Sequence, residues 1–412
     1  MIEIAILGFG VVGSGVAEVC RMNKGMIQER AGEEIHIKKI LDIRDFSGSP
    51  YADRITGNAD EIFNDPAISV VVETIGGADV AYELSRKALE SRKHVVTSNK
   101  ELVATFGPEL MALAREQGVS YMFEASVGGG IPIVRPLHKC LSANVIERVA
   151  GILNGTTNFI LTQMEQGGID FKEALAEAQN RGYAEQNPTA DVDGFDACRK
   201  IAILGSITFS EFIDSSQIYT EGISAVTVTD MAYARQLGCK IKLIGSFRRH
   251  AGQTAELIVA PMLIARQNPI AVADDVFNAI MVVGNALGEA MFYGRGAGRM
   301  PTASAVVADV IECAMHLGKI PHLVPWKRSA RQIILPHAEC QVKALLRLRK
   351  DLPVPAVESA LGEYGLEWQP AQNDQEQAVL VGLNGSLTEL ALDQRLKTWG
   401  DQVISRIRLF QE

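Results

Sequence analysis

The first part of the chain alternates short apolar runs with longer segments of helical periodicity. The run ISVVVETI at residues 68–75 has no polar alternation, which is typical of a strand buried on both faces of a parallel sheet. Apolar residues with helical spacing follow at 78–92. Strands are predicted by the apolar runs at residues 2–7, 35–43, 68–75, 94–97 and 119–123. This alternation predicts an α/β domain with a doubly wound parallel sheet, whose ligand lies at the carboxyl ends of the strands.

From Asn144 the pattern changes, because strands now cluster among helices. NVIERVAGILNGTTNFIL predicts a strand that ends at residues 155–157 and a helix after them. Further strands are predicted at 240–247 and 256–263. This middle part of the chain is therefore expected to be an α+β domain.

The later part of the chain is expected to return to the first domain and then to form a separate unit. Residues 277–309 carry this return, with a helix beginning near Pro301. From residue 338 the pattern predicts the order βαββαβ. The predicted domains are 1–143 with about 295–325, 144–294, and 338–412.

The first apolar run leads directly into GFGVVGSG, which places G-x-G-x-x-G between a strand and a helix. In the dinucleotide-binding fingerprint, Gly8 allows a tight turn, Gly10 lets the backbone approach a pyrophosphate, and Gly13 lets helix and strand pack closely. The N–H groups at the start of that helix favour phosphate. The context predicts a Rossmann domain for a nicotinamide cofactor, with a glycine turn that binds nothing as the alternative. The candidate cofactor-binding residues in this loop are Gly8, Phe9, Gly10, Val11, Val12 and Gly13.

The end of the second predicted strand, LDIRDFSG, leaves the choice between NAD and NADP open. Asp42 or Asp45 could accept a hydrogen bond from the ribose 2′-OH of NAD. Arg44 could instead pair with the 2′-phosphate of NADP.

Composition and charge exclude several classes of partner. The 412 residues are 47% apolar and 22% charged with a formal net charge of −9, and they contain no basic stripe, so nucleic acid is not expected. No apolar run approaches the roughly 20 residues that span a bilayer, and a strand that begins at Ile2 leaves no room for a targeting peptide. The six cysteines and seven histidines show no metal-ligand spacing, which predicts reduced thiols in a cytoplasmic protein without a transition-metal site.

The stretch GYAEQNPTADVDGFDACRKIAIL, from Gly182 to Leu204, contains the densest candidate chemistry. A polar loop with several carboxylates precedes an apolar helix, and Asp196 and Lys200 share one face of that helix because they are four residues apart. Such a cluster suits a site that binds a small zwitterion and moves a proton. The alternative is an ordinary helical ion pair worth roughly 0.2–0.5 kcal/mol.

Two further stretches follow predicted strands of the first domain. Lys100 comes just after the strand at 94–97, so it is expected near the nicotinamide, with a solvated surface lysine as the alternative. EASVGGGIPIVRPL, from Glu124, contains three consecutive glycines, so its backbone is expected to pass close to a ligand or to another part of the chain. A purely structural glycine turn is the alternative there.

Three stretches resemble signatures of the homoserine dehydrogenases: GYAEQNPTADVDGFDACRK, NGTTNFIL and GAGRMPTASAVVAD. The first has Gln186-Asn187 where a small residue or proline followed by aspartate is usual, and Arg295 stands before the third where proline is common. The resemblance implies reversible hydride transfer between a nicotinamide cofactor and the pair L-aspartate 4-semialdehyde and L-homoserine. It also implies that the α+β domain forms a homodimer or homotetramer.

The resemblance and the needs of this reaction together suggest a role for each polar residue. Hydride arriving at an aldehyde carbon leaves an alkoxide, for which Lys200 is the candidate proton donor. Lys100 would stabilise the same oxygen and contact the cofactor, and Asp196 would position Lys200 or a water. The implied substrate-binding residues are Glu185 and Asp191, for the ammonium group, and Gly155 and Thr156, for the floor of the site.

The resemblance also bears on cofactors and ions. It places Arg44-Asp45 on the usual Arg-Asp of NADP-using members, which favours NADP(H) over NAD(H). It implies a bound Na⁺ or K⁺, held by one acidic residue and main-chain carbonyls, hard oxygen ligands that suit such an ion. The implied ligands are Glu124, Val127, Gly129 and Ile131.

The C-terminal unit resembles the ACT domain of many bacterial members, which commonly senses threonine. Its first strand is followed by RKDLPVPAV, which lacks the glycine of the usual D-x-P-G. Ligand binding by this unit therefore does not follow from the resemblance.

Two other functions are compatible with the two-domain plan. One is another amino-acid dehydrogenase, acting on aspartate or diaminopimelate, although such an enzyme would not need both NGTT and the D-x-x-x-K helix. The other is a nicotinamide-sensing protein without catalysis. The intact set of acidic and basic candidate residues argues against a non-catalytic protein. Oxidation of NADPH on addition of the semialdehyde would distinguish an enzyme from such a sensing protein.

Overall fold

The computed structural model describes residues 1–250, 254–319, 326–328 and 331–411. The chain forms two compact units. Unit 1 consists of Met1–Val145, Ala202–Ser215 and Gly294–Ala330, and unit 2 consists of Ile146–Ile201, Ser216–Tyr293 and Arg331–Glu412. The three domain ranges predicted from the sequence are not tested by this division into two units and stay a prediction.

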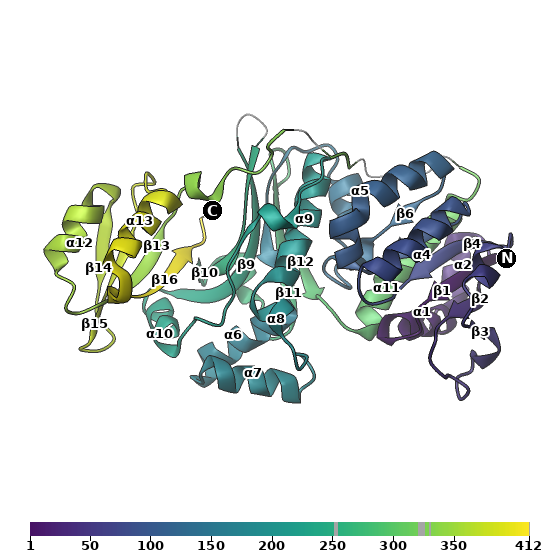
Figure 1. The fold of residues 1–412 in the computed structure, drawn as a ribbon, viewed down its shortest axis with the longest axis horizontal. Helices are drawn as coiled ribbons and strands as arrows, with labels where there is room; N and C mark the ends of the chain where they lie inside the picture. Colours follow the sequence, from purple (N-terminus) through teal and green to yellow (C-terminus); the bar gives the residue numbers. More distant parts are fainter. Residues whose placement is uncertain (251–253, 320–325, 329–330, 412) are drawn as a thin grey trace. The chain divides into compact units, whose positions relative to one another are not determined.

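Unit 1 is built on a parallel sheet. Its strands are β1 (Ile2–Leu7), β2 (Ile35–Leu41), β3 (Ile55–Thr56), β4 (Ile68–Glu73), β5 (His94–Thr97) and β6 (Tyr121–Met122). Within the described residues these six strands run parallel in the order β3-β2-β1-β4-β5-β6 (Figure 1). This is the Rossmann order, which reverses direction between β1 and β4 and places ligands at the carboxyl ends of the strands. The predicted doubly wound sheet is confirmed.

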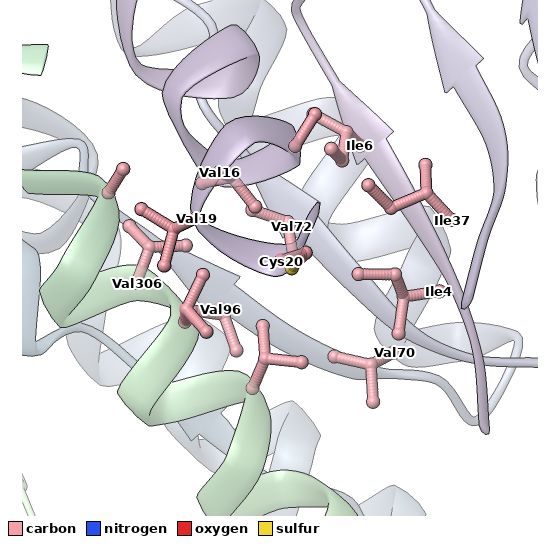
Figure 2. Close-up of a cluster of buried hydrophobic side chains, with 14 of the residues drawn as sticks. Ile4, Ile6, Val16, Val19, Cys20, Ile37, Val70, Val72, Val96 and Val306 are labelled. Atoms are coloured by element: carbon pink, nitrogen blue, oxygen red, sulfur yellow. The ribbon is translucent and has the colours of Figure 1, made fainter. Parts of the chain in front are cut away.

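Helices cover both faces of this sheet. They are α1 (Val11–Met22), α2 (Lys24–Ala31), α3 (Asp60–Phe63), α4 (Asp79–Glu90), α5 (Lys100–Gln117) and α11 (Arg299–Met315). Helices α1, α2 and α11 pack together over one face, where alternate strand residues such as Ile4 and Ile6 meet Val16 and Val306 (Figure 2). The helix predicted near Pro301 is therefore α11, and burying its apolar side chains attaches this late segment to the sheet.

Unit 2 is built on a mixed sheet. Its strands are β7 (Ile146–Ile152), β8 (Tyr219–Thr220), β9 (Cys239–His250), β10 (Thr254–Ala265), β11 (Phe277–Gly284), β12 (Gly288–Arg295), β13 (Ala344–Arg349), β14 (Leu366–Gln369), β15 (Glu376–Val381) and β16 (Val403–Leu409). In the described part of the chain the order is β12-β11-β7-β9-β10-β16-β13-β15-β14, with β8 beside β10. The antiparallel pair β9–β10 extends beyond the strands predicted at 240–247 and 256–263.

One expectation for this region is wrong. Residues 277–309 were expected to return directly to the first domain, but β11 and β12 extend the sheet of unit 2, and unit 1 resumes at Gly294. The run FNAIMVVG pairs antiparallel with β7. Apolar residues predict a buried segment but do not specify its pairing partner, so the sequence alone does not place β11 beside β7.

Several helices accompany this sheet. They are α6 (Gly155–Gly167), α7 (Phe171–Asn180), α8 (Thr189–Val192), α9 (Phe195–Phe209), α10 (Val228–Gln236), α12 (Val354–Leu361) and α13 (Glu389–Trp399). Helix α9 begins in unit 2, and the chain passes into unit 1 at Ala202. The predicted substrate residues Gly155 and Thr156 begin α6 and Asp191 lies in α8, while the predicted catalytic pair Asp196 and Lys200 lies in α9.

The C-terminal part of unit 2 has the predicted βαββαβ order. Its strands pair as β16-β13-β15-β14, which is the order of a split βαβ motif. Strand β16 also pairs in parallel with β10, through Met262 with Arg408 and Leu263 with Leu409. The fold class is confirmed, whereas the ACT-like character of this segment stays a prediction.

Candidate active site

The glycine-rich loop of unit 1 has the geometry that a pyrophosphate requires. Gly8 has a φ of 88°, and a Cβ on Gly13 would lie 2.0 Å from the Gly8 carbonyl oxygen. Gly10 is the N-cap of α1 and supplies no side-chain acceptor to the N–H groups of the first turn. This turn therefore presents its N–H groups at the carboxyl end of β1, as in an anion site at a helix N-terminus.

The other residues of this loop divide between the core and the surface. The Phe9 side chain is buried and makes edge contacts with Phe46 and Tyr51. Val12 packs partly against the core, while Val11 is exposed. Phe9 thus anchors the loop, and its N–H group connects the loop to the end of the next strand.

That connection is a hydrogen bond of 2.7 Å from the Phe9 N–H to Asp42 Oδ2. Arg44 binds the same carboxylate at two points, Nε to Oδ1 at 3.0 Å and Nη2 to Oδ2 at 2.7 Å. The Arg44 guanidinium, helped by the two backbone N–H donors and opposed by desolvation, holds the pKa of Asp42 well below its usual range. Both oxygens of Asp42 therefore already accept hydrogen bonds. Asp45 accepts instead from Ser47.

Lys100 is the first residue of α5 and lies half-buried just after the carboxyl end of β5. The preceding Asn99 caps this helix, accepting from the Leu102 N–H at 3.0 Å, and its amide donates to the carbonyl oxygens of Ile75 and Gly77. The loops after β4 and β5 are thereby connected, and Lys100 is fixed at the edge of the sheet where the fold binds its ligands.

Glu73 was not predicted as a functional residue, yet it lies at the same edge. It is the last residue of β4 and is fully buried. Its carboxylate accepts from the Ile75 N–H and the Thr97 hydroxyl. Burial raises its pKa to about 7 in spite of these hydrogen bonds. A charged residue closing an otherwise apolar strand was the signal that could have identified it.

The glycine loop after β6 is held by Glu124 and by close backbone packing. The Glu124 carboxylate accepts from the N–H groups of three successive residues, 133–135, at 2.7 to 2.9 Å. A Cβ on Gly129 would lie 2.6 Å from the Gly296 carbonyl oxygen, and one on Gly130 would lie 2.7 Å from Pro301. The close approach that the glycines predicted is thus made by the chain itself, and the carboxylate of Glu124 already binds backbone. Val127 and Ile131 of the same loop are buried.

In unit 2 the structure brings Asp196 and Lys200 into direct contact. Lys200 Nζ lies 2.7 Å from Asp196 Oδ2, and Nζ also donates to the Leu153 carbonyl oxygen at 2.7 Å. Both side chains are almost completely buried, with 3% of Asp196 and 9% of Lys200 exposed. At this burial the pair is not the solvated helical ion pair considered as the alternative, because each charge depends on its partner for solvation.

Asn154 joins this pair to Asp191, and sequence reasoning missed it. Its amide nitrogen donates to Asp191 Oδ1 at 2.7 Å and to Asp196 Oδ2 at 2.8 Å. The residue sits between β7 and α6 as the N-cap of α6. The available signal was an asparagine placed between an apolar strand and a glycine-initiated helix, which was interpreted only as part of a motif.

The remaining predicted substrate residues lie on α6 and on the loop before α8. Glu185 is exposed on the loop after α7. The Thr156 hydroxyl donates to the Tyr183 carbonyl oxygen at 2.7 Å. A Cβ on Gly155 would lie 2.8 Å from the Val276 carbonyl oxygen, so backbone packing requires glycine there.

Other classes of site find little support in the part of the chain that the structure describes. No group of three or more His, Cys, Asp or Glu side chains there could hold a metal ion. All six cysteines carry free thiols. Among the described helices, none has both the length and the apolar character needed to cross a bilayer.

Comparisons of the sequence agree on one family. A family model described as homoserine dehydrogenase matches residues 132–311, and one described as the NAD binding domain of homoserine dehydrogenase matches residues 8–124. The chain is 43% identical to a homoserine dehydrogenase of Pseudomonas aeruginosa over 380 residues, which cover 89% of this chain and 86% of the relative. It is 43% identical to that of Bacillus subtilis over 314 residues, covering 75% and 72%.

Solved structures show the same likeness. A homoserine dehydrogenase from Thiobacillus denitrificans superposes with a TM-score of 0.90 at 39% identity, covering 100% of this chain and 98% of the other. A hyperthermophilic archaeal homoserine dehydrogenase in complex with NADPH superposes with a TM-score of 0.66 at 27% identity, covering 78% and 99%.

Proposed function

The chain belongs to the homoserine dehydrogenase family, and we propose that the buried Lys200–Asp196 pair supplies the proton in its reaction. The reaction is the reversible, NAD(P)H-dependent reduction of L-aspartate 4-semialdehyde to L-homoserine, a step in the biosynthesis of threonine, methionine and isoleucine. When bound, the nicotinamide cofactor supplies the hydride to the aldehyde carbon. The residues of this chain must bind the amino acid, orient the aldehyde and deliver a proton to its oxygen.

Lys200 is the best-supported proton donor. Its ammonium group is buried and held by two acceptors, the Leu153 carbonyl oxygen and Asp196 Oδ2. A positioned general acid needs such fixation, because proton transfer depends first on geometry. Asp196 would keep Lys200 protonated before transfer and stabilise the site while the proton is replaced from water.

The substrate's ammonium group would bind carboxylates near this pair. Asp191 supports that role because its carboxylate lies in the same hydrogen-bonded group, through Asn154. Glu185 would contribute from the exposed loop before α8, and Gly155 and Thr156 would line the floor at the start of α6. Lys100 would add a second cation that stabilises the developing oxyanion electrostatically.

Steady-state oxidation of NADPH by L-aspartate 4-semialdehyde tests the role of Lys200. The variant Lys200→Met keeps much of the side-chain volume but removes the acid, so kcat should fall at least about 10²-fold, as expected for a positioned proton donor. Lys242→Met is the matched control, because Lys242 is also a buried lysine of unit 2, paired with Asp274. It should lose stability but retain kcat.

The outcomes distinguish an error in the assigned proton donor from an error in the proposed activity. If the wild type turns over and Lys200→Met nearly matches it, another group delivers the proton. If the wild type binds nicotinamide cofactors and reduces no semialdehyde, the sensing alternative replaces catalysis.

We further propose that NADP(H) is the preferred cofactor. Support comes from Arg44, whose exposed guanidinium follows β2, and from Asp42, whose two oxygens are already occupied by hydrogen bonds. Asp42 would therefore offer no open acceptor to the ribose 2′-OH of NAD, whereas a 2′-phosphate would find the Arg44 cation. The glycines at 8, 10 and 13 fit the pyrophosphate of either cofactor.

A Na⁺ or K⁺ ion is proposed at the loop after β6. The Glu124 carboxylate accepts three backbone N–H groups, two at Oε1 and one at Oε2, so Oε2 keeps one lone pair for an ion. Glu124 would be the acidic ligand, and the main-chain carbonyl oxygens of Val127, Gly129 and Ile131 would complete the site. Replacing K⁺ and Na⁺ by tetramethylammonium at constant ionic strength should lower kcat, and an unchanged kcat would contradict a required ion.

The assembly, the C-terminal segment and the location of the protein stay predictions. A homodimer or homotetramer would be checked by light scattering of the purified chain. The ACT-like interpretation rests on the βαββαβ order alone, and threonine titration monitored by calorimetry would test whether it binds a regulator. The cytoplasmic location is an expectation from the sequence.

A further inference from the structure

Asn154 uses every hydrogen-bonding position of its side-chain amide. The nitrogen donates to Asp191 Oδ1 and Asp196 Oδ2 at 2.7 and 2.8 Å. The oxygen accepts from the Thr157 N–H at 2.8 Å and from the Thr157 hydroxyl at 3.0 Å. Two donors and two lone pairs are all that this amide has. The residue is 5% exposed, so water cannot replace these partners easily.

The partners also fix which way the amide points. Reversing it would place its oxygen against two carboxylate oxygens and one of its N–H groups against the Thr157 N–H. Each reversed contact would leave a buried polar group without a partner, at about 1–3 kcal/mol each. The amide nitrogen of Asn154 is therefore held between Asp191 and Asp196.

This location matters because the two carboxylates come from different elements. Asp191 lies on α8 and Asp196 on α9, and carboxylates so placed would repel one another without a donor between them. Asp196 Oδ2 receives both Asn154 Nδ2 and Lys200 Nζ. The adjacent Leu153 carbonyl also accepts from Lys200, so residues 153 and 154 together orient the ammonium and its counter-ion.

We propose that Asn154 is a positioning residue of the homoserine dehydrogenase reaction: its amide holds Asp196, and through it Lys200, in place for proton transfer, and holds Asp191 in place for the substrate's ammonium. The proposal rests on the roles assigned above to these three residues. Asn154 itself acts through the two carboxylates.

Two substitutions separate positioning from helix capping. Serine and aspartate are both good N-caps, so Asn154→Ser and Asn154→Asp should preserve the start of α6. Serine is too short to reach both carboxylates, and aspartate places a third carboxylate against them. Asp170→Ser is the matched control, because Asp170 caps the neighbouring α7 by accepting from the Glu173 N–H at 2.9 Å.

We expect Asn154→Ser to lower kcat about 10²-fold, the loss typical of a small displacement in a reacting geometry. It should also raise the KM for the semialdehyde, through Asp191. Asn154→Asp should lose at least as much. The Kd for NADPH should stay within about twofold of the wild-type value, since the predicted cofactor residues belong to unit 1. Asp170→Ser should retain the wild-type kcat even if its melting temperature falls as far as that of Asn154→Ser.

A double-variant cycle tests the route of the effect. If Asn154 acts through Asp196, adding Asn154→Ser to Asp196→Asn should reduce the residual kcat by less than about twofold, because coupled residues are not additive. An equal fold-loss in both backgrounds would overturn the proposal, as would a kcat for Asn154→Ser within about twofold of wild type. A wild type without homoserine dehydrogenase turnover would overturn the proposed function and this inference together, whereas turnover by wild type and Asn154→Ser alike overturns only the inference.

Discussion

The guanidinium of Arg44 and the carboxylate of Asp42 form a two-point contact, with Nε–Oδ1 at 3.0 Å and Nη2–Oδ2 at 2.7 Å. The carboxylate side chain is 5% exposed and the guanidinium side chain 58%. Asp42 therefore holds Arg44 from the core side, while the cation remains accessible at the end of β2. The pair thus stabilises the strand end and presents a positive group.

Arg44→Ala should weaken NADPH much more than NADH. A charge-assisted hydrogen bond contributes about 1.5–3 kcal/mol, so the KM for NADPH should rise roughly 10- to 100-fold, with the KM for NADH nearly unchanged. Arg54→Ala serves as a control, since Arg54 donates to the carbonyl oxygen of Ile37 in β2 but is not a predicted cofactor residue. An equal loss for both cofactors would contradict a 2′-phosphate contact and would show instead that the strand end had been disrupted.

Gly13→Ala should impair both folding and cofactor binding. Its Cβ would meet the Gly8 carbonyl oxygen at 2.0 Å, and relief of that clash must displace α1 or the glycine loop at a cost of about 1–3 kcal/mol. Gly25→Ala is the matched change, because nothing lies within 4 Å of a Cβ there and the residue is inside α2. It should stabilise the protein by roughly 0.5–1 kcal/mol. Thermal unfolding with and without NADPH would compare the two variants.

Glu73 should make stability fall as the pH rises towards neutrality. Its pKa in the folded protein is raised from the ordinary 4.5 to about 7, so between these values the folded state binds more protons than the unfolded state. Its stabilising contribution is complete below pH 4.5 and is lost as the pH rises through 7. Glu73→Gln mimics the protonated form, so the variant should gain stability relative to wild type across this window, by up to about 3 kcal/mol.

Urea unfolding at pH 5, 6, 7 and 8 would measure this difference. Glu61→Gln is a suitable control, because Glu61 is an exposed carboxylate of the same unit whose pKa is lowered by Lys39. A constant difference between Glu73→Gln and wild type at all four pH values would show that Glu73 keeps an ordinary pKa.

Local signals in the sequence predicted the parts of the site that lie within one element or one turn. Gly8 and Gly13 are five residues apart and pack against one another, so the glycine spacing of the fingerprint was sufficient to predict their contact. Asp196 and Lys200 are four residues apart on one helix, so their contact followed from the helical repeat. In both cases the relevant neighbours are close in the chain.

The remaining contacts depend on pairings that no local pattern specifies. Asn154 contacts Asp191 across 37 residues, and this contact depends on how β7, α8 and α9 are placed, which no local pattern specifies. Whether Asp42 or Arg44 contacts the cofactor likewise depends on side-chain conformations, and the two side chains are paired with each other. Strand β11 was missed because its partner β7 lies more than a hundred residues earlier in the chain.

Arg347 offers the clearest test of how the C-terminal segment is stabilised. This residue of β13 is 5% exposed and binds Asp230 of α10 at 2.9 Å and Glu376 of β15 at 2.6 Å. Arg347→Met would leave two buried carboxylates without their cation, which should destabilise the protein by about 3–5 kcal/mol. Removing one of them as well, in Arg347→Met/Glu376→Gln, should recover part of the loss, because the double variant buries one fewer uncompensated charge.

Arg349→Met provides the comparison within the same strand. Arg349 is exposed and donates to the Asp401 carbonyl oxygen, so its loss should change stability by no more than about 0.5–1 kcal/mol. Two of the three tryptophans, Trp368 and Trp399, lie in the C-terminal segment, so fluorescence during urea unfolding reports on it directly. Equal losses for Arg347→Met and Arg349→Met would show that apolar packing, rather than the buried ion pairs, stabilises this segment.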